Sequence, residues 1–180
     1  MRSMVWALAG LVWAGAAEAQ TSPADLLAGT AGAWAGALGY RDYQSNRLFE
    51  LPVETDIVLA ADGRTLIRTS RFDEGAAPAV FIVSAAAFDA ESGLYETAGF
   101  RAGRAMYVSR ERVSVQAAAD ASHWTLIFAE RGMDDDRAAD IRITLTRNGD
   151  EMLSVKEVDY LDDPDVRFEF RNQTRLTRVR

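Results

Sequence analysis

His123 is the only histidine in this chain of 180 residues, which has no cysteine. One imidazole excludes sites with several histidine ligands, and the lack of thiols excludes disulfides, zinc–thiolate sites and iron–sulfur clusters. His123 could be a haem ligand or a general base, and a Ser–His–Asp triad would have to use it beside Ser122. The chain has no Gly-x-Ser-x-Gly, P-loop or His-Glu-x-x-His motif. We interpret His123 as a residue of a loop or rim.

Two acidic loops contain carboxylates at short spacing. Asp134, Asp135 and Asp136 follow one another, and a second group follows residue 158: Asp159, Asp162, Asp163 and Asp165. Carboxylate oxygens bind Ca²⁺, but neither spacing follows the EF-hand pattern. We therefore predict solvated turns and neither a metal nor a cofactor, although the two loops could form a joint cation site if they met at one end of the fold.

A third acidic pair, Glu157 and Asp159, lies on one face of a predicted strand. If that face points inward, the two carboxylates could pair with an interior arginine or act as an acid or base. The opposite parity places Met152, Ser154 and Lys156 inside instead. The pattern leaves the register open and favours structural ion pairing over catalysis.

Charge and the first residues limit the class of protein. The chain has 27 acidic and 20 basic residues and a net charge of -7, which argues against nucleic acid as a partner. Residues 1–19 combine Arg2, an uncharged apolar run and a small-x-small triplet, a pattern typical of a secretory signal peptide. No later segment is long enough to span a membrane as a helix. We expect a periplasmic or secreted domain over residues 20–180, with an oligomeric state that the sequence leaves open.

The expected domain has one short helix followed by strands. Ser22 suits an N-cap, Pro23 the first helical position and Gly29 the C-terminal cap. Alternating apolar residues then predict about ten strands, with 112–116 either continuing one of them or forming another. The predicted strands are 34–40, 51–59, 65–72, 79–84, 94–98, 104–109, 124–130, 141–145, 152–159 and 166–178. Short turns make neighbours antiparallel, and closure removes the exposed edges, so we predict an all-β, up-and-down barrel.

The aromatic residues suggest what such a barrel could hold. A ten-stranded barrel is wide enough to enclose a small ligand. Part of its aromatic set should therefore line a cavity as well as form the core. The predicted interior candidates are Tyr40, Phe81, Tyr107, Trp124, Phe128, Phe168 and Phe170.

Gly32, Ala33 and Trp34 open the first strand just after the short helix. They resemble the Gly-x-Trp signature of lipocalins and related calycin barrels. The resemblance implies that Trp34 sits at the closed end of the barrel, under an arginine from the last strand. Of the arginines available there we choose Arg178, because it shares the parity of the apolar face of that strand.

The strand number and the secondary-structure pattern also resemble those of nitrobindin-type haem barrels. In that family the haem-binding histidine lies near the end of the chain, where this sequence has only arginine and polar residues. The resemblance therefore fails at the residue that would hold the haem.

We therefore expect an exported barrel that binds a small apolar or amphipathic ligand in its interior. The alternatives are a structural or partner-binding envelope protein with a filled barrel, and an enzyme whose site lies in the barrel mouth. The presence of an interior cavity distinguishes the first alternative from ligand binding.

Overall fold

A computed structural model of the chain describes residues 22–41, 47–165 and 167–180. It contains one helix, α1 (Pro23–Ala28), and ten strands. The strands are β1 (Gly32–Arg41), β2 (Leu48–Leu59), β3 (Leu66–Phe72), β4 (Val80–Asp89), β5 (Leu94–Arg101), β6 (Tyr107–Asp120), β7 (His123–Asp134), β8 (Arg137–Asn148), β9 (Glu151–Tyr160) and β10 (Glu169–Arg178). The predicted signal peptide lies outside the described residues.

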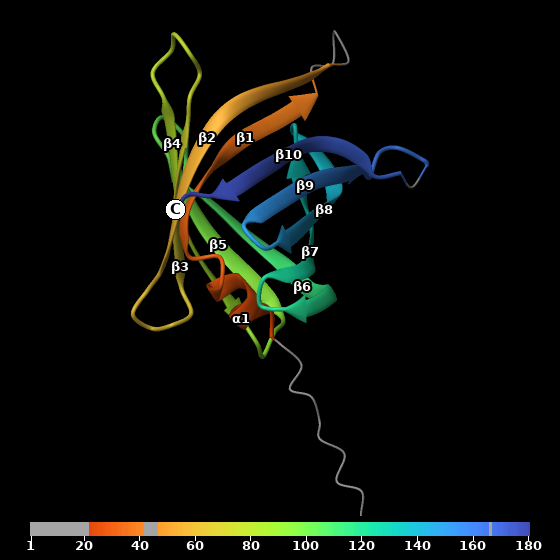
Figure 1. Cartoon of the computed structure of the whole chain (residues 1–180). Helices are drawn as coiled ribbons and strands as arrows, with labels where there is room; N and C mark the ends of the chain where they lie inside the picture. The colour runs from red at the N-terminus through yellow and green to blue at the C-terminus, as the bar shows by residue number, and fades with distance from the viewer. Residues whose placement is uncertain (1–21, 42–46, 166) are drawn as a thin grey trace, which may run out of the picture.

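All ten strands belong to one closed barrel (Figure 1). Each strand pairs in antiparallel fashion with the next strand along the chain, and β1 closes the barrel by pairing with β10. This confirms the predicted all-β, up-and-down barrel with a short N-terminal helix. Because every strand has two neighbours, the barrel has no free edge.

Among the strand boundaries that differ from the prediction, those of β6 and β10 have a clear physical reason. Residues 104–109 and 112–116 contribute to a single long strand, β6, because no glycine or proline interrupts the chain between Tyr107 and Asp120. The last strand begins only at Glu169, and its register with β9 shifts between Phe170 and Asn172. Such an irregularity changes which side chains face inward.

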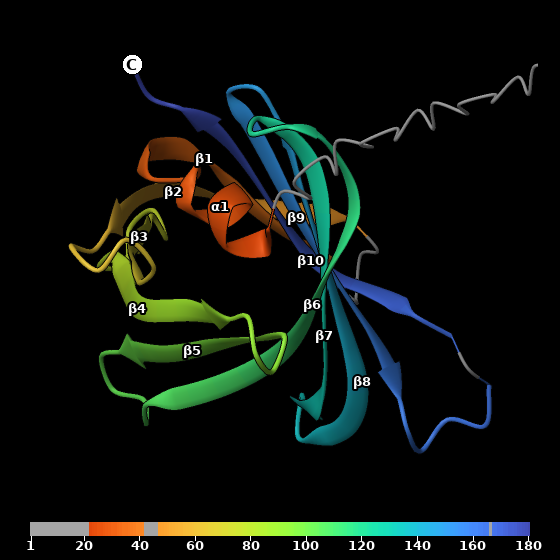
Figure 2. The same ribbon diagram turned by 90° about the horizontal axis from the view of Figure 1, so that it is seen from below.

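Helix α1 lies at one end of the barrel, as Figure 2 shows. Ser22 Oγ accepts a hydrogen bond from the Asp25 backbone N–H at 3.2 Å, and proline occupies the first turn without losing a helical hydrogen bond. Leu26 and Leu27 are buried and place the apolar side of the helix against β4 and β6. The helix therefore closes this end of the barrel.

The main core lies next to the helix. It contains Leu26, Trp34, Trp124, Leu126 and Leu176 among its buried members. At the β1–β10 seam, Gly36 has no side chain, and an added Cβ would overlap the Arg175 backbone carbonyl. Glycine thus permits the close approach that joins the first strand to the last.

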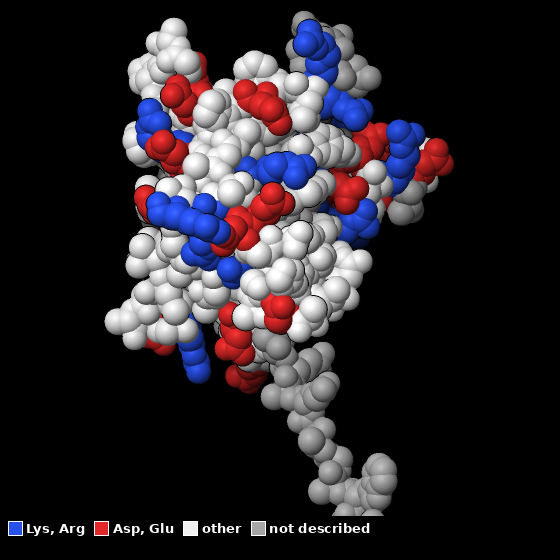
Figure 3. All heavy atoms as spheres, viewed as in Figure 1, with Lys and Arg blue, Asp and Glu red and all other residues white. Residues whose placement is uncertain are grey.

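The outer face seen in Figure 3 carries acidic and basic side chains interspersed. Several form cross-strand pairs, such as Arg110 Nε with Glu96 at 2.7 Å and Arg131 Nε with Asp140 at 2.7 Å. No helix within the described residues is long and apolar enough to cross a membrane.

Candidate functional site

The barrel interior contains a cavity of about 480 Å³. Apolar residues from the helix, β2, β3 and β8 line part of its wall, and polar or charged residues line the rest. The charged and aromatic residues of the lining include Arg68, Tyr95, Tyr107, Glu111, Phe128, Glu130 and Lys156, and Ser84 lines the cavity from β4. A second space of about 120 Å³ shares Arg68, Ser70, Phe72, Leu145 and Ser154 with the first.

One wall of the cavity carries two carboxyl groups beside two aromatic rings. The β5–β6 register places Tyr95 opposite Glu111. The β6–β7 register, which pairs Arg112 with Ala129, brings Glu130 next to Glu111 on the inner face. The rings of Tyr95 and Phe128 contact edge to face, with their centroids 5.4 Å apart. We call Tyr95, Glu111, Phe128 and Glu130 the acidic corner.

Glu111 is the most perturbed carboxyl group of the acidic corner. Only 8% of the surface of Glu111 is exposed. Burial, reinforced by the nearby Glu130 carboxylate and opposed by Lys156, raises the pKa of Glu111 to about 7. This group therefore changes charge near neutral pH.

Two basic side chains face the same cavity from other strands. Arg68 on β3 is exposed, whereas Lys156 on β9 is half-buried. Lys156 Nζ donates to Asp134 Oδ1 at 2.7 Å. Arg171 Nε lies 2.7 Å from the other oxygen of Asp134, and the Tyr160 hydroxyl donates to that oxygen at 3.0 Å. The Lys156 charge is therefore already shared with a buried acid.

The structure brings only part of the predicted aromatic set to the cavity. Tyr107 and Phe128 line it, and Tyr107 lies across Gly99, which has no side chain to obstruct the ring. Trp124 is buried in the main core and does not line the cavity. Tyr40 is 38% exposed and packs against Phe49 with ring centroids 5.3 Å apart.

Phe81, Phe168 and Phe170 do not line the cavity, contrary to the interior placement predicted for them. Phe81 is exposed because Ile82 takes the inward position on β4. Phe168 precedes β10 and lies under Arg142, whose guanidinium carbon is 4.0 Å from the ring centroid. The register shift of β10 places Phe170 opposite Glu157, on the face away from the inward Lys156.

The predicted pair of Trp34 and Arg178 lies at the helix end of the barrel. The two residues are register partners, and the Arg178 guanidinium carbon lies 4.4 Å from the centroid of the Trp34 ring. Arg178 also donates to the carbonyl oxygens of Ala31 at 2.9 Å and Gly29 at 3.2 Å. Trp34 Nε1 donates to Thr30 at 2.8 Å. These contacts hold the segment after α1 against the last strand.

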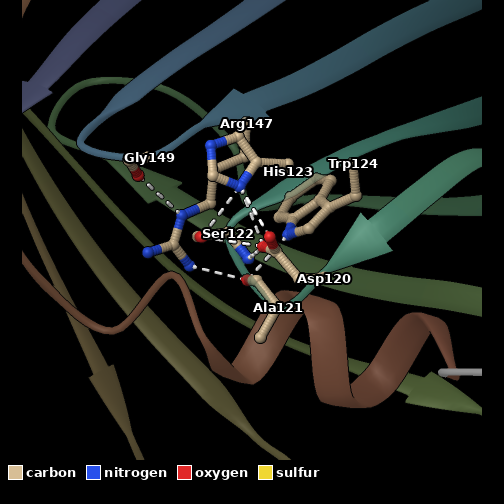
Figure 4. A network of polar contacts seen from close by, with 7 residues as sticks. All are labelled: Asp120, Ala121, Ser122, His123, Trp124, Arg147 and Gly149. Carbon is tan, nitrogen blue, oxygen red and sulfur yellow. Dashed lines mark hydrogen bonds and ion pairs between the residues drawn. The ribbon is translucent and has the colours of Figure 1, made fainter.

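His123 belongs to a polar network at the β6–β7 turn, shown in Figure 4. Its Nδ1 lies 2.9 Å from the Asp120 carboxylate and 3.2 Å from Ser122 Oγ, which itself donates to Asp120 at 2.8 Å. In a catalytic triad the serine and the acid would contact opposite nitrogens of the ring. Here both contact Nδ1, so this group has the geometry of a capped turn.

The two acidic loops predicted from the sequence lie side by side, and an arginine joins them by an ion pair. Arg137 Nε donates to Asp162 Oδ2 at 3.2 Å and links the two loops. Among the described residues, no group of acidic and histidine side chains could hold a metal ion. Glu157 pairs with Arg142 at 3.0 Å, and Asp159 is buried and accepts the Arg167 backbone N–H. Of the two parities that the sequence left open for β9, the structure has the one with Ser154 and Lys156 facing the interior.

Of the charged residues that line the cavity, the sequence pattern raised only Lys156 as an interior candidate and did not single out Arg68, Glu111 or Glu130. Alternation on β6 puts Glu111 on the same face as Val113 and Val115. This shared apolar face is the sequence pattern that could have indicated an inward Glu111. Arg68 and Glu130 likewise share a parity with apolar neighbours on their strands.

No model of a protein family matches the chain, and no curated protein matches it. Among solved structures, the barrel is similar to the crystal structure of Rv2717c from M. tuberculosis, with a TM-score of 0.60 and 16% sequence identity. The similarity covers 89% of this chain and 100% of that one. At this level of identity the likeness shows a calycin-like barrel fold alone.

Proposed function

We propose that this protein binds a small amphipathic molecule inside its barrel. The observation that carries the proposal is the cavity of about 480 Å³, a volume typical of sites for small ligands. Apolar side chains such as Ile57 and Leu145 can contact a hydrocarbon or aromatic body, while Glu111, Glu130 and Arg68 offer polar contacts. A filled interior, the alternative expected for a purely structural barrel, has less support.

We further propose that the protein is an exported, lipocalin-like binder. Residues 1–19 support export by their pattern alone. The contact between Trp34 and Arg178 supports the lipocalin-like interpretation, because it matches what the Gly-x-Trp resemblance implies. A periplasmic or secreted binder would meet its ligand outside the cytoplasm.

The experiment titrates the purified protein with the uncharged fluorophore N-phenyl-1-naphthylamine. We expect a saturable rise in fluorescence with one site per chain. Ser84 lines the cavity, whereas its neighbour Ala85 is exposed on the outer face of β4. Ser84→Phe should place an aromatic ring in the cavity and weaken binding about tenfold or more, equivalent to about 1.4 kcal/mol. The matched Ala85→Phe control should bind like the wild type.

Two results would overturn the proposal. Ser84→Phe binding the fluorophore as tightly as the wild type would place the probe outside the barrel, and the absence of saturable binding would indicate an interior that takes no ligand.

A further inference from the structure

The acidic corner contains a carboxyl group that opens into the cavity and has no partner among the described residues. Glu111 is 8% exposed, and within the described part of the chain it forms neither a hydrogen bond nor an ion pair. No fully buried side-chain oxygen or nitrogen among the described residues lacks a hydrogen bond, so the oxygens of Glu111, which form none, are accessible from the cavity. The carboxyl group of Glu111 faces the cavity, so a partner for it would come from the contents of the cavity.

The surroundings of Glu111 indicate the charge of that partner. Glu130 lies beside it on the inner face of β7, so the corner gathers two carboxylates. Of the two basic residues that line the cavity, Lys156 already donates to Asp134 at 2.7 Å. Arg68 is on β3, three strands away around the barrel from β6, and it makes no ion pair with either glutamate. The corner thus has an excess of negative charge.

The aromatic members of the corner suit an organic cation. Tyr95 stands opposite Glu111, and its ring contacts that of Phe128. Aromatic faces attract ammonium groups, and carboxylates form strong, charge-assisted hydrogen bonds with N–H donors. A compact metal ion would use only the oxygens, whereas an amine on an apolar body would use the carboxylates and the rings.

We propose that the ligand of the barrel carries a protonated amine, which binds between Glu111 and Glu130 with its apolar body along Tyr95 and Phe128. This inference rests on the proposed function and specifies the class of ligand. Arg68 lines the cavity from β3, three strands from β6, and offers a contact for a polar or anionic group of the ligand.

Binding of a cation at this corner depends on pH. The titratable and charged groups that face Glu111 are Tyr95 from β5, Tyr107 from its own strand, Glu130 from β7, Lys156 from β9 and Arg68 from β3. Because the pKa of Glu111 is raised to about 7, its carboxyl group is mostly protonated at pH 6 and mostly ionised at pH 8. An alkylammonium probe stays protonated throughout this range, so its affinity should rise about tenfold from pH 6 to pH 8.

The test compares three probes of one shape that differ in charge: 2-phenylethylammonium, 2-phenylethanol and 3-phenylpropionate. Each competes with N-phenyl-1-naphthylamine for the wild-type protein at pH 6 and pH 8. We expect the ammonium probe to bind at least about tenfold more tightly than the alcohol at pH 8, and this ratio to shrink at pH 6. Glu111→Gln and Glu130→Gln should each reduce the ratio, whereas Glu50→Gln, the same change at an exposed position, should preserve it.

The outcomes separate this inference from the proposed function. If the fluorophore binds but the alcohol or the propionate competes as well as the amine does, the amine class is wrong and the binding function stands. If the fluorophore shows no saturable binding, the proposed function fails and this inference fails with it. The pH dependence of the wild type decides the question even if a glutamine variant does not fold.

Discussion

The raised pKa of Glu111 predicts a stability that falls as pH rises. In the unfolded chain the carboxyl group titrates near its ordinary value of 4.5, whereas in the folded protein the pKa is about 7. Between these values the folded state binds more protons than the unfolded state, so the free energy of unfolding decreases with increasing pH. At about 1.4 kcal/mol per pH unit, the loss from this one group reaches about 3 kcal/mol by pH 8.

Glu111→Gln removes the titration while keeping the shape of the side chain. We expect the variant and the wild type to have similar stability at pH 4.5. At pH 8 the variant should be more stable by up to about 3 kcal/mol, because it has no buried charge to solvate. The assay is urea unfolding followed by circular dichroism at half-unit steps from pH 4.5 to pH 8, with the midpoint and the slope fitted together.

The control for this experiment is Glu50→Gln, which replaces an exposed carboxyl group. Its difference from the wild type should stay constant within about 0.5 kcal/mol over the same range. A stability difference for Glu111→Gln that does not change with pH would refute the reasoning, because it would mean that Glu111 titrates alike in the folded and unfolded chains.

Variants at three further positions test the closure of the barrel and its surface. Arg178→Ala should lower the free energy of unfolding by about 2 kcal/mol, since it removes the cation from Trp34 and two hydrogen bonds to backbone carbonyls. Arg178→Lys should restore only part of this free energy. Equal stability of the wild type and both variants in urea would contradict the prediction. Gly36→Ala should cost about 3 kcal/mol or prevent folding, because the added methyl group meets the Arg175 carbonyl; a thermal midpoint like that of the wild type would show that the seam can adjust. His123→Ala should change stability by less than about 1 kcal/mol and leave fluorophore binding intact, and a loss of binding would give the β6–β7 turn a role in the site.

The sequence could predict the fold because turns and alternation are local properties. Gly63, Gly93 and Gly149 have positive φ, and each lies between two of the predicted strands. The N-cap role of Ser22 and the inward parity of Leu176 follow from neighbours a few residues away. The closing of the barrel follows from the number of strands and the short connections between them.

The site was less predictable, because its features depend on packing between distant strands. Alternation puts Glu111 and Val113 on one face of β6 but does not say that this face also meets Glu130 and Tyr95 across a cavity. The inward parity of Phe170 was lost through the register shift of β10. A shift of this kind depends on how two strands pair, which no single segment specifies.

The pairing of β1 with β10 determines when the chain is protected against pairing with other chains. Until Glu169–Arg178 is available, β1 and β9 each present an unpaired edge, and such edges can pair with other chains. A product of synthesis or proteolysis that ends before residue 169 would keep most of the apolar interior but leave the wall open along that line. Resistance to aggregation is therefore acquired with the last ten residues of the barrel, in one step and late.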